Sequence, residues 1–153
     1  MLYNPQRGNL DMNKIKIISQ LPYSKPFLFV DEIISISDVS VEGNYTFDAN
    51  LDFYKGHFKN NPITPGVILI ETMAQIGLVC LGIYLNRNEN SKPSFALSSI
   101  EIEFLKPVFP NEKVTVISEK IYFRFGKLKC RVKMLNVQNE TVCEGFISGI
   151  QIN

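Results

Sequence analysis

The sequence predicts an α+β fold in which a curved antiparallel sheet of about five to six strands wraps around one long central helix. Residues 64–85 form the longest apolar run in the chain, while residues 94–152 alternate polar and apolar positions between turn-forming residues. One helix and several antiparallel strands bury the most apolar surface when the sheet wraps around the helix.

The elements before this helix are predicted from their pattern and punctuation. Asn13–Leu21 is a short helical candidate, and Leu21–Pro26 is a turn bracketed by two prolines. Phe27–Ser37 and Val39–Phe47 then form two β-rich runs.

The central helix has a marked start and end. Thr64 is predicted as its N-cap with Pro65 at the first helical position, and the polar stretch Asn86–Ser91 as its end. Residues 66–85 have the length of a membrane span. Since nothing else in the chain is membrane-like, we expect a core helix wrapped by other structure and no membrane insertion.

The last third of the chain is predicted to be β-rich throughout. Its four strands are expected at Ser94–Phe104, Lys113–Phe123, Lys127–Val137 and Thr141–Ile152. Turns are expected at Phe125-Gly126 and Gln138-Asn139. Within Lys127–Met134 one face is basic and the other apolar, as in a half-buried antiparallel strand. Open edge strands of two such sheets can pair, which predicts a homodimer.

Composition limits the function classes. At 153 residues, with 45% apolar and 20% charged residues, residues 1–153 are expected to form a single domain. A net charge of +1 implies no global attraction to nucleic acid or anionic lipid. Cys80, Cys130 and Cys143 lack metal-ligand spacing and are interpreted as core thiols in a reducing compartment. Met1–Arg7 has no apolar stretch, so a cytoplasmic location is expected.

Two titratable side chains mark the candidate site. Glu71 lies inside the apolar run, and His57, the only histidine, lies just upstream. A carboxylate buried without a partner costs several kcal/mol or takes up a proton. Imidazole is the side chain that titrates nearest neutral pH. His57 is therefore a candidate general base and Glu71 the complementary general acid.

The start of the helix adds a third chemical group to the candidate site. Gly66 falls in the first helical turn, where backbone N–H groups lack intrahelical acceptors and can hold a carbonyl oxygen that becomes negative. Glu71 lies six residues after Pro65, roughly 9 Å along the axis at 1.5 Å per residue, and Gln75 shares its face one turn later. Singly, each residue has an ordinary structural explanation, but their combination at this spacing is specific.

These residues lie in motifs that resemble the bacterial 3-hydroxyacyl-acyl-carrier-protein dehydratases of type II fatty-acid synthesis. The matching segments are Gly56-His57-Phe58, Pro62-Ile63, Pro65-Gly66-Val67, Glu71 and Met73-Ala74-Gln75, with Leu21-Pro22, Pro26-Phe27-Leu28, Val30-Asp31 and Phe104-Leu105-Lys106-Pro107-Val108 elsewhere. The similarity covers nearly the whole chain from about residue 20.

The resemblance implies a hotdog fold and dehydration of a (3R)-hydroxyacyl thioester on acyl carrier protein to the trans-2-enoyl thioester. It implies His57 and Glu71 as the catalytic pair, contributed by two subunits, and a Gly66 N–H that binds the thioester carbonyl. The expected substrate-binding residues are Gly66, Val67, Gln75, Phe58, Ile63 and Phe95. The family often assembles as a trimer of dimers, and no metal or redox cofactor is expected.

Departures from the family pattern leave the catalytic pair intact but leave the acyl-chain preference open. Tyr23 stands where the family commonly has histidine, Lys59-Asn60-Asn61 replaces a usual Pro-Gly-Lys, Thr64 replaces an apolar residue, and Asn111-Glu112 replaces a common Gly-Asp. Basic candidates for docking the acidic carrier are Lys106, Lys127, Lys129, Arg131 and Lys133. Two alternatives stay open: a hotdog thioesterase, and a non-catalytic acyl-thioester-binding subunit.

Overall fold

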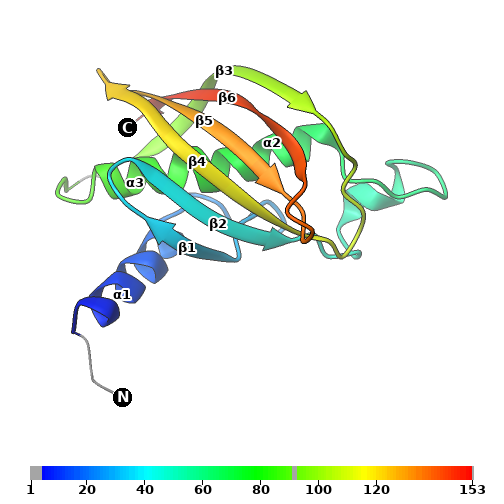
Figure 1. The fold of residues 1–153 in the computed structure, drawn as a ribbon, viewed down its shortest axis with the longest axis horizontal. Coiled ribbons are helices and arrows are strands. Elements are labelled where there is room, and N and C mark those ends of the chain that lie inside the picture. The colour runs from blue at the N-terminus through cyan, green and yellow to red at the C-terminus, as the bar shows by residue number, and fades with distance from the viewer. Residues whose placement is uncertain (1–4, 91–92, 153) are drawn as a thin grey trace.

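In the computed structural model, which describes residues 5–90 and 93–152, a curved sheet covers one side of a long helix (Figure 1). The described residues form one six-stranded antiparallel sheet in the order β1-β2-β4-β5-β6-β3. The strands are β1 (Glu32–Ile36), β2 (Ser40–Thr46), β3 (Ser94–Phe104), β4 (Lys113–Arg124), β5 (Lys127–Leu135) and β6 (Thr141–Ile152). The α+β architecture predicted from the sequence is confirmed.

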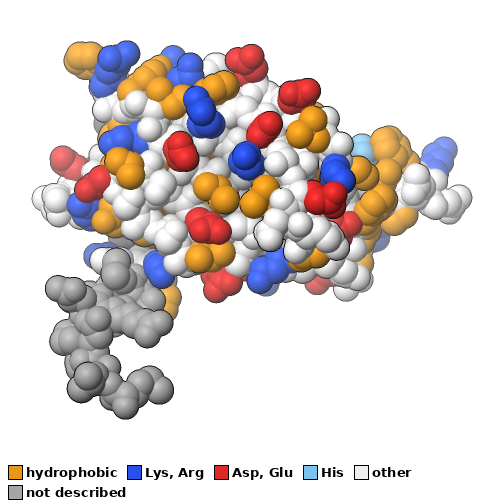
Figure 2. All heavy atoms as spheres, viewed as in Figure 1, with side chains coloured by type: hydrophobic (Ala, Val, Ile, Leu, Met, Phe, Trp, Pro, Cys, Tyr) orange, Lys and Arg blue, Asp and Glu red, His pale blue; other side chains and the backbone are white. Residues whose placement is uncertain are grey.

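Alternation along the strands separates the two faces of the sheet. On β5 the side chains of Leu128, Cys130, Val132 and Met134 are buried against the helix, and the basic residues between them face outward. Figure 2 shows acidic and basic side chains interspersed on the outer face of the sheet. The predicted half-buried strand is confirmed.

The central helix runs from Gly66 to Leu85 in three consecutive parts. They are α2 (Gly66–Ala74), a π-helical turn η2 (Gln75–Val79) and α3 (Cys80–Leu85). This helix is long and apolar enough to cross a membrane, but 72% of its most apolar 18-residue stretch is buried inside the described structure. Every side chain from Thr72 to Ile83 is buried, as expected for a core helix.

Two helical glycines bring the helix close to the sheet. A Cβ added at Gly77 would lie 3.0 Å from the Ser118 Cβ, and the Ser118 hydroxyl donates a buried hydrogen bond of 2.8 Å to the Gly77 carbonyl. A Cβ at Gly82 would lie 2.3 Å from the Phe95 ring. Larger side chains at either position would push β4 or β3 away from the helix.

The start of the helix differs from the prediction. Pro65, with φ −58° and ψ 138°, is the N-cap residue, and Gly66 is the first helical residue. Thr64 is buried, and its hydroxyl shares a 2.5 Å hydrogen bond with the Tyr54 hydroxyl. The prediction of Thr64 as N-cap and Pro65 at the first helical position is wrong, because a tertiary partner binds the Thr64 hydroxyl.

The segment before β1 also differs from the sequence-based prediction. The predicted strand from Phe27 begins only at Glu32, because residues 21–31, which we call the strap, cross the central helix instead. The N-terminal helix α1 (Pro5–Ser19) begins earlier than the predicted helix and ends two residues before Leu21.

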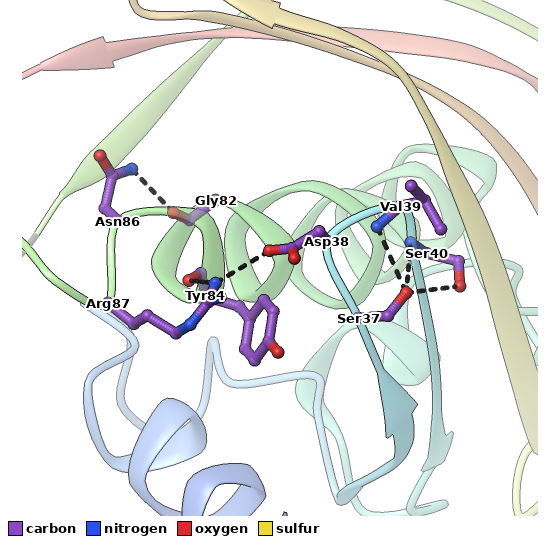
Figure 3. A network of polar contacts seen from close by, with 8 residues as sticks. All are labelled: Ser37, Asp38, Val39, Ser40, Gly82, Tyr84, Asn86 and Arg87. Atoms are coloured by element: carbon purple, nitrogen blue, oxygen red, sulfur yellow. Dashed lines mark hydrogen bonds and ion pairs between the residues drawn. The ribbon is translucent and has the colours of Figure 1, made fainter.

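A polar network fixes the far end of the helix (Figure 3). The Arg87 guanidinium donates to Asp38 in the β1–β2 turn at 2.9 Å and to the Tyr84 carbonyl at 3.0 Å, while its plane lies over the Tyr84 ring. Asn86 donates to the Gly82 carbonyl at 2.8 Å. These bonds satisfy carbonyl groups that the end of a helix leaves open.

The three cysteines lie in the core as predicted. Cys80, Cys130 and Cys143 are buried free thiols, and burial raises the pKa of each to about 12, 11 and 12 respectively. A thiol that stays protonated is a poor nucleophile, so these cysteines fill space in the core.

Candidate active site

The loop that carries His57 is fixed by its own backbone. It follows the 3₁₀ helix η1 (Asp52–Lys55), and the His57 N–H donates to the Phe53 carbonyl at 3.0 Å. The Ile63 N–H donates to the His57 carbonyl at 2.9 Å, and the His57–Phe58 peptide bond is cis. The loop therefore closes on itself directly before the central helix.

The same loop sets the tautomer of the imidazole. His57 Nδ1 lies 2.8 Å from the Ile63 carbonyl oxygen. Because a carbonyl oxygen can only accept, Nδ1 carries the proton, and Nε2 presents its lone pair. A half-buried imidazole with a free Nε2 lone pair is suited to remove a proton from a bound molecule.

The helix start provides backbone donors next to this loop. Within the described residues, the N–H groups of Gly66 and Val67 have no hydrogen-bond acceptor, and the first helical bond runs from Ile68 N to the Pro65 carbonyl. They lie at the positive end of the helix dipole. A Cβ at Gly66 would lie 3.1 Å from the Phe104 ring, so a side chain there would press against β3.

Gln75 holds the carboxyl group of Glu71. The Gln75 Nε2 donates to Glu71 Oε1 and to the Phe27 carbonyl, both at 3.0 Å, and its Oε1 accepts from the Phe29 N–H at 2.8 Å. This network fixes the orientation of the fully buried amide. Gln75 and Glu71 thus share one face of the helix, as the sequence predicts. The other carboxyl oxygen, Oε2, has no hydrogen-bond partner among the described residues.

The remaining predicted site residues fall into two groups. The Phe58 ring stacks on the His57 imidazole with centroids 3.9 Å apart, and both Phe58 and Val67 are exposed in the single chain. Ile63 contributes its backbone to the loop. Phe95, by contrast, packs against Gly82 near the opposite end of the central helix, so the structure does not bring it together with the others.

Three contacts that position the site were not expected from the sequence. The Ile63 carbonyl orients His57, and the Tyr54–Thr64 hydroxyl pair ties η1 to the residue before the helix cap. The Thr64 N–H also donates to the Val108 carbonyl at 2.8 Å. Backbone carbonyls leave no signal in a sequence, and a lone tyrosine or threonine gives too weak a signal.

Four of the five basic residues considered for carrier docking contact other side chains of the same chain. Lys129 and Arg131 both lie 5.5 Å from the centre of the Phe146 ring, and Lys133 lies 3.8 Å from Glu144. Lys106 forms an ion pair with Glu140.

The surroundings of the histidine are apolar. In Figure 2 its pale blue side chain lies toward the upper right, next to hydrophobic side chains. Phe58, Val67 and Phe104 are about half exposed or more. Apolar side chains beside an imidazole and open backbone donors are typical of a site that excludes water from a bound ligand.

Comparison with known proteins places this arrangement in a family. The family model of the FabA-like domain matches residues 21–146. The 3-hydroxyacyl-[acyl-carrier-protein] dehydratase FabZ of Caldicellulosiruptor bescii is 34% identical over 133 residues, which cover 85% of this chain and 91% of that protein. The protein of the same name from Ehrlichia canis is 34% identical over 146 residues, covering 90% and 94%.

Solved structures confirm the hotdog fold expected from the sequence. The dehydratase heterocomplex ApeI:P from Xenorhabdus doucetiae matches with a TM-score of 0.74 at 14% identity, covering 90% of this chain and 91% of that one. A hypothetical thioesterase with coenzyme A from Streptococcus pneumoniae matches with a TM-score of 0.62 at 16% identity, covering 80% and 85%. At these identities the likeness concerns the fold alone. On the family model and the sequence relatives together, this chain belongs to the FabA-like domain family and, within it, to the FabZ-type 3-hydroxyacyl-[acyl-carrier-protein] dehydratases.

Proposed function

We propose that the protein dehydrates a (3R)-hydroxyacyl thioester carried on acyl carrier protein to the trans-2-enoyl thioester. The observation that carries the proposal is that separate hydrogen bonds prepare one side chain as a base and another as an acid. The Ile63 carbonyl leaves Nε2 of His57 as a base, and Gln75 holds Glu71 by one oxygen. The relatives named above carry the same activity in their names.

The proposed reaction moves one proton at each of two carbons. His57 Nε2 takes the proton from C2, and the Gly66 N–H donates to the thioester oxygen as negative charge develops there. Glu71 gives a proton to the hydroxyl group at C3, which leaves as water while the C2–C3 double bond forms. The phosphopantetheine arm arrives with the substrate, and no bound metal or redox cofactor takes part in these steps.

We further propose that the two catalytic side chains act across a homodimer. Within the described chain, His57 and Glu71 share no hydrogen bond. The sheet ends at β3, whose outer edge is unpaired in the single chain, and Leu97, Ile100 and Phe104 on this strand are between 40% and 48% exposed. Pairing two β3 edges would cover these side chains and place the two helix starts near each other.

An assay of carrier-bound substrate tests the activity and separates it from its alternatives. A dehydratase converts 3-hydroxyacyl carrier protein to a product with the ultraviolet absorbance of an enoyl thioester. A thioesterase would instead release free thiol, detected with a thiol-reactive dye. An acyl-binding subunit would bind the thioester without either signal. Release of free thiol, or the absence of both signals, from the folded wild-type protein would refute the proposal.

The dimer proposal predicts the effect of a charge on the edge strand. Ile100→Lys should yield a monomer by light scattering and lower the dehydration rate by about 100-fold, because the acid and base would no longer meet. Ile121→Lys on β4 is the matched control, since Ile100 and Ile121 are both 45% exposed. A monomeric Ile100→Lys variant with full activity would show that one chain suffices.

A further inference from the structure

The strap is linked to the proposed acid through the side chain of Gln75. Gln75 donates to the Phe27 carbonyl and accepts from the Phe29 N–H, and the same amide holds Glu71. The turn at the start of the strap is closed by a 2.8 Å hydrogen bond from the Phe27 N–H to the Ser24 carbonyl. The strap and the carboxyl group of Glu71 therefore share one anchor, and Tyr23 precedes that turn.

A row of aromatic rings fixes the strap in place. The ring of Tyr23 lies 6.4 Å from Phe27, Phe27 lies 5.1 Å from Phe29, and Phe29 lies 5.5 Å from Tyr45 on β2, centroid to centroid. Phe29 and Tyr45 are buried, whereas Tyr23 and Phe27 lie at the open end of the row. The two contacts of Phe29 are edge-on, and such contacts hold rings in defined orientations, while the Tyr23–Phe27 contact is tilted.

The phenol of Tyr23 is half-buried and stays uncharged. Burial, followed by the negative charge of Glu71 and then the Cys80 thiol, raises the pKa of Tyr23 to about 12. Geometry places the phenol in this neighbourhood, because the Tyr23 ring contacts Phe27, whose carbonyl shares the Gln75 amide with Glu71. At neutral pH the side chain thus offers the surroundings of Glu71 a neutral hydroxyl group on a half-buried ring.

We propose that Tyr23 is a specificity-determining residue that borders the acyl chain just beyond the carbon on which Glu71 acts. This inference rests on the proposed dehydratase function, in which Glu71 meets the C3 hydroxyl group. The next carbons of the acyl chain must then pass along the side chains that surround Glu71. A large ring with a polar tip takes up room there and favours short or polar acyl groups over long apolar ones.

The test measures kcat/KM for a ladder of saturated 3-hydroxyacyl carrier substrates with short to long chains. Tyr23→Phe removes only the polar tip, and we expect the ratio of long-chain to short-chain kcat/KM to rise about threefold or more. Tyr23→Ala also removes the ring, and we expect a rise of about tenfold or more. Tyr122→Phe, the same change on β4 in a tyrosine that contacts Arg124, should leave the ratio unchanged.

A structural role for Tyr23 would give a different result. Loss of strap stability would lower kcat/KM for every chain length by the same factor, and an unchanged ratio in a folded Tyr23→Phe variant would overturn the proposal. Tyr23→Phe keeps the ring and the row of aromatic contacts, so the test survives if Tyr23→Ala does not fold. Wild-type protein that dehydrates no chain length would overturn the proposed function and this inference together, whereas an active enzyme with an unchanged ratio would overturn this inference alone.

Discussion

The His57→Ala variant is expected to dehydrate 3-hydroxyacyl carrier substrate about 10²–10⁴-fold more slowly than the wild type. The variant lacks the only imidazole in the chain and therefore the base that we propose for the C2 proton. Its kcat should fall with little change in KM, because the group acts in the transition state. Steady-state kinetics with the ultraviolet signal of the enoyl product measures both constants.

Loss of the loop structure must be separated from loss of the base. The imidazole also donates to the Ile63 carbonyl, so His57→Ala removes a hydrogen bond together with the Nε2 lone pair. In His57→Asn, the side-chain amide N–H can replace that hydrogen bond but supplies no base. We expect both variants to be inactive and His57→Asn to unfold at the wild-type temperature. Near-normal turnover by His57→Asn would remove His57 from its proposed role.

The Glu71→Gln variant is expected to lose turnover by a similar factor, about 10²–10⁴-fold, because an amide cannot protonate the departing hydroxyl group. The substitution conserves shape, and the Gln75 Nε2 can still donate to the new carbonyl oxygen. The fold and the substrate affinity should therefore stay close to those of the wild type, as measured by thermal unfolding and by binding of a carrier-bound substrate.

Proton exchange at C2 distinguishes the two roles. In deuterated water, Glu71→Gln should still exchange the C2 proton of bound substrate through His57, whereas His57→Ala should not. Glu119→Gln makes the same chemical change on the exposed outer face of β4 and should leave turnover unaffected. Exchange that survives in His57→Ala and disappears in Glu71→Gln would reverse the assignment of acid and base.

The β-rich last third was predictable because each strand carries its own signal. The bounds of β3 and β6 agree with the sequence-based ranges, and β5 keeps the predicted buried face from Leu128 to Met134. Turn residues separate these strands, with positive φ at Phe125 and Gly126 in the predicted turn. Local patterns suffice here even for β3, which pairs with β6 and not with its neighbour in the sequence.

Features set by distant partners were not predictable from local pattern. Thr64 has the composition of a helix cap, but its hydroxyl binds Tyr54 instead. Phe27 begins a β-like run, but Gln75 fixes it in the strap, 48 residues away in the sequence. Phe95 is an apolar residue of the kind that lines ligand pockets, but its ring fills the space beside Gly82. In each case a tertiary contact overrides the local preference.

The uneven burial of the central helix has a consequence for laboratory evolution. Val67, Ile68 and Ile70 keep part of their surface open, whereas all side chains from Thr72 to Ile83 are enclosed. A saturation mutagenesis library should therefore yield folded variants mainly when it varies the first turns of the helix. Substitutions in the enclosed turns would disrupt the core.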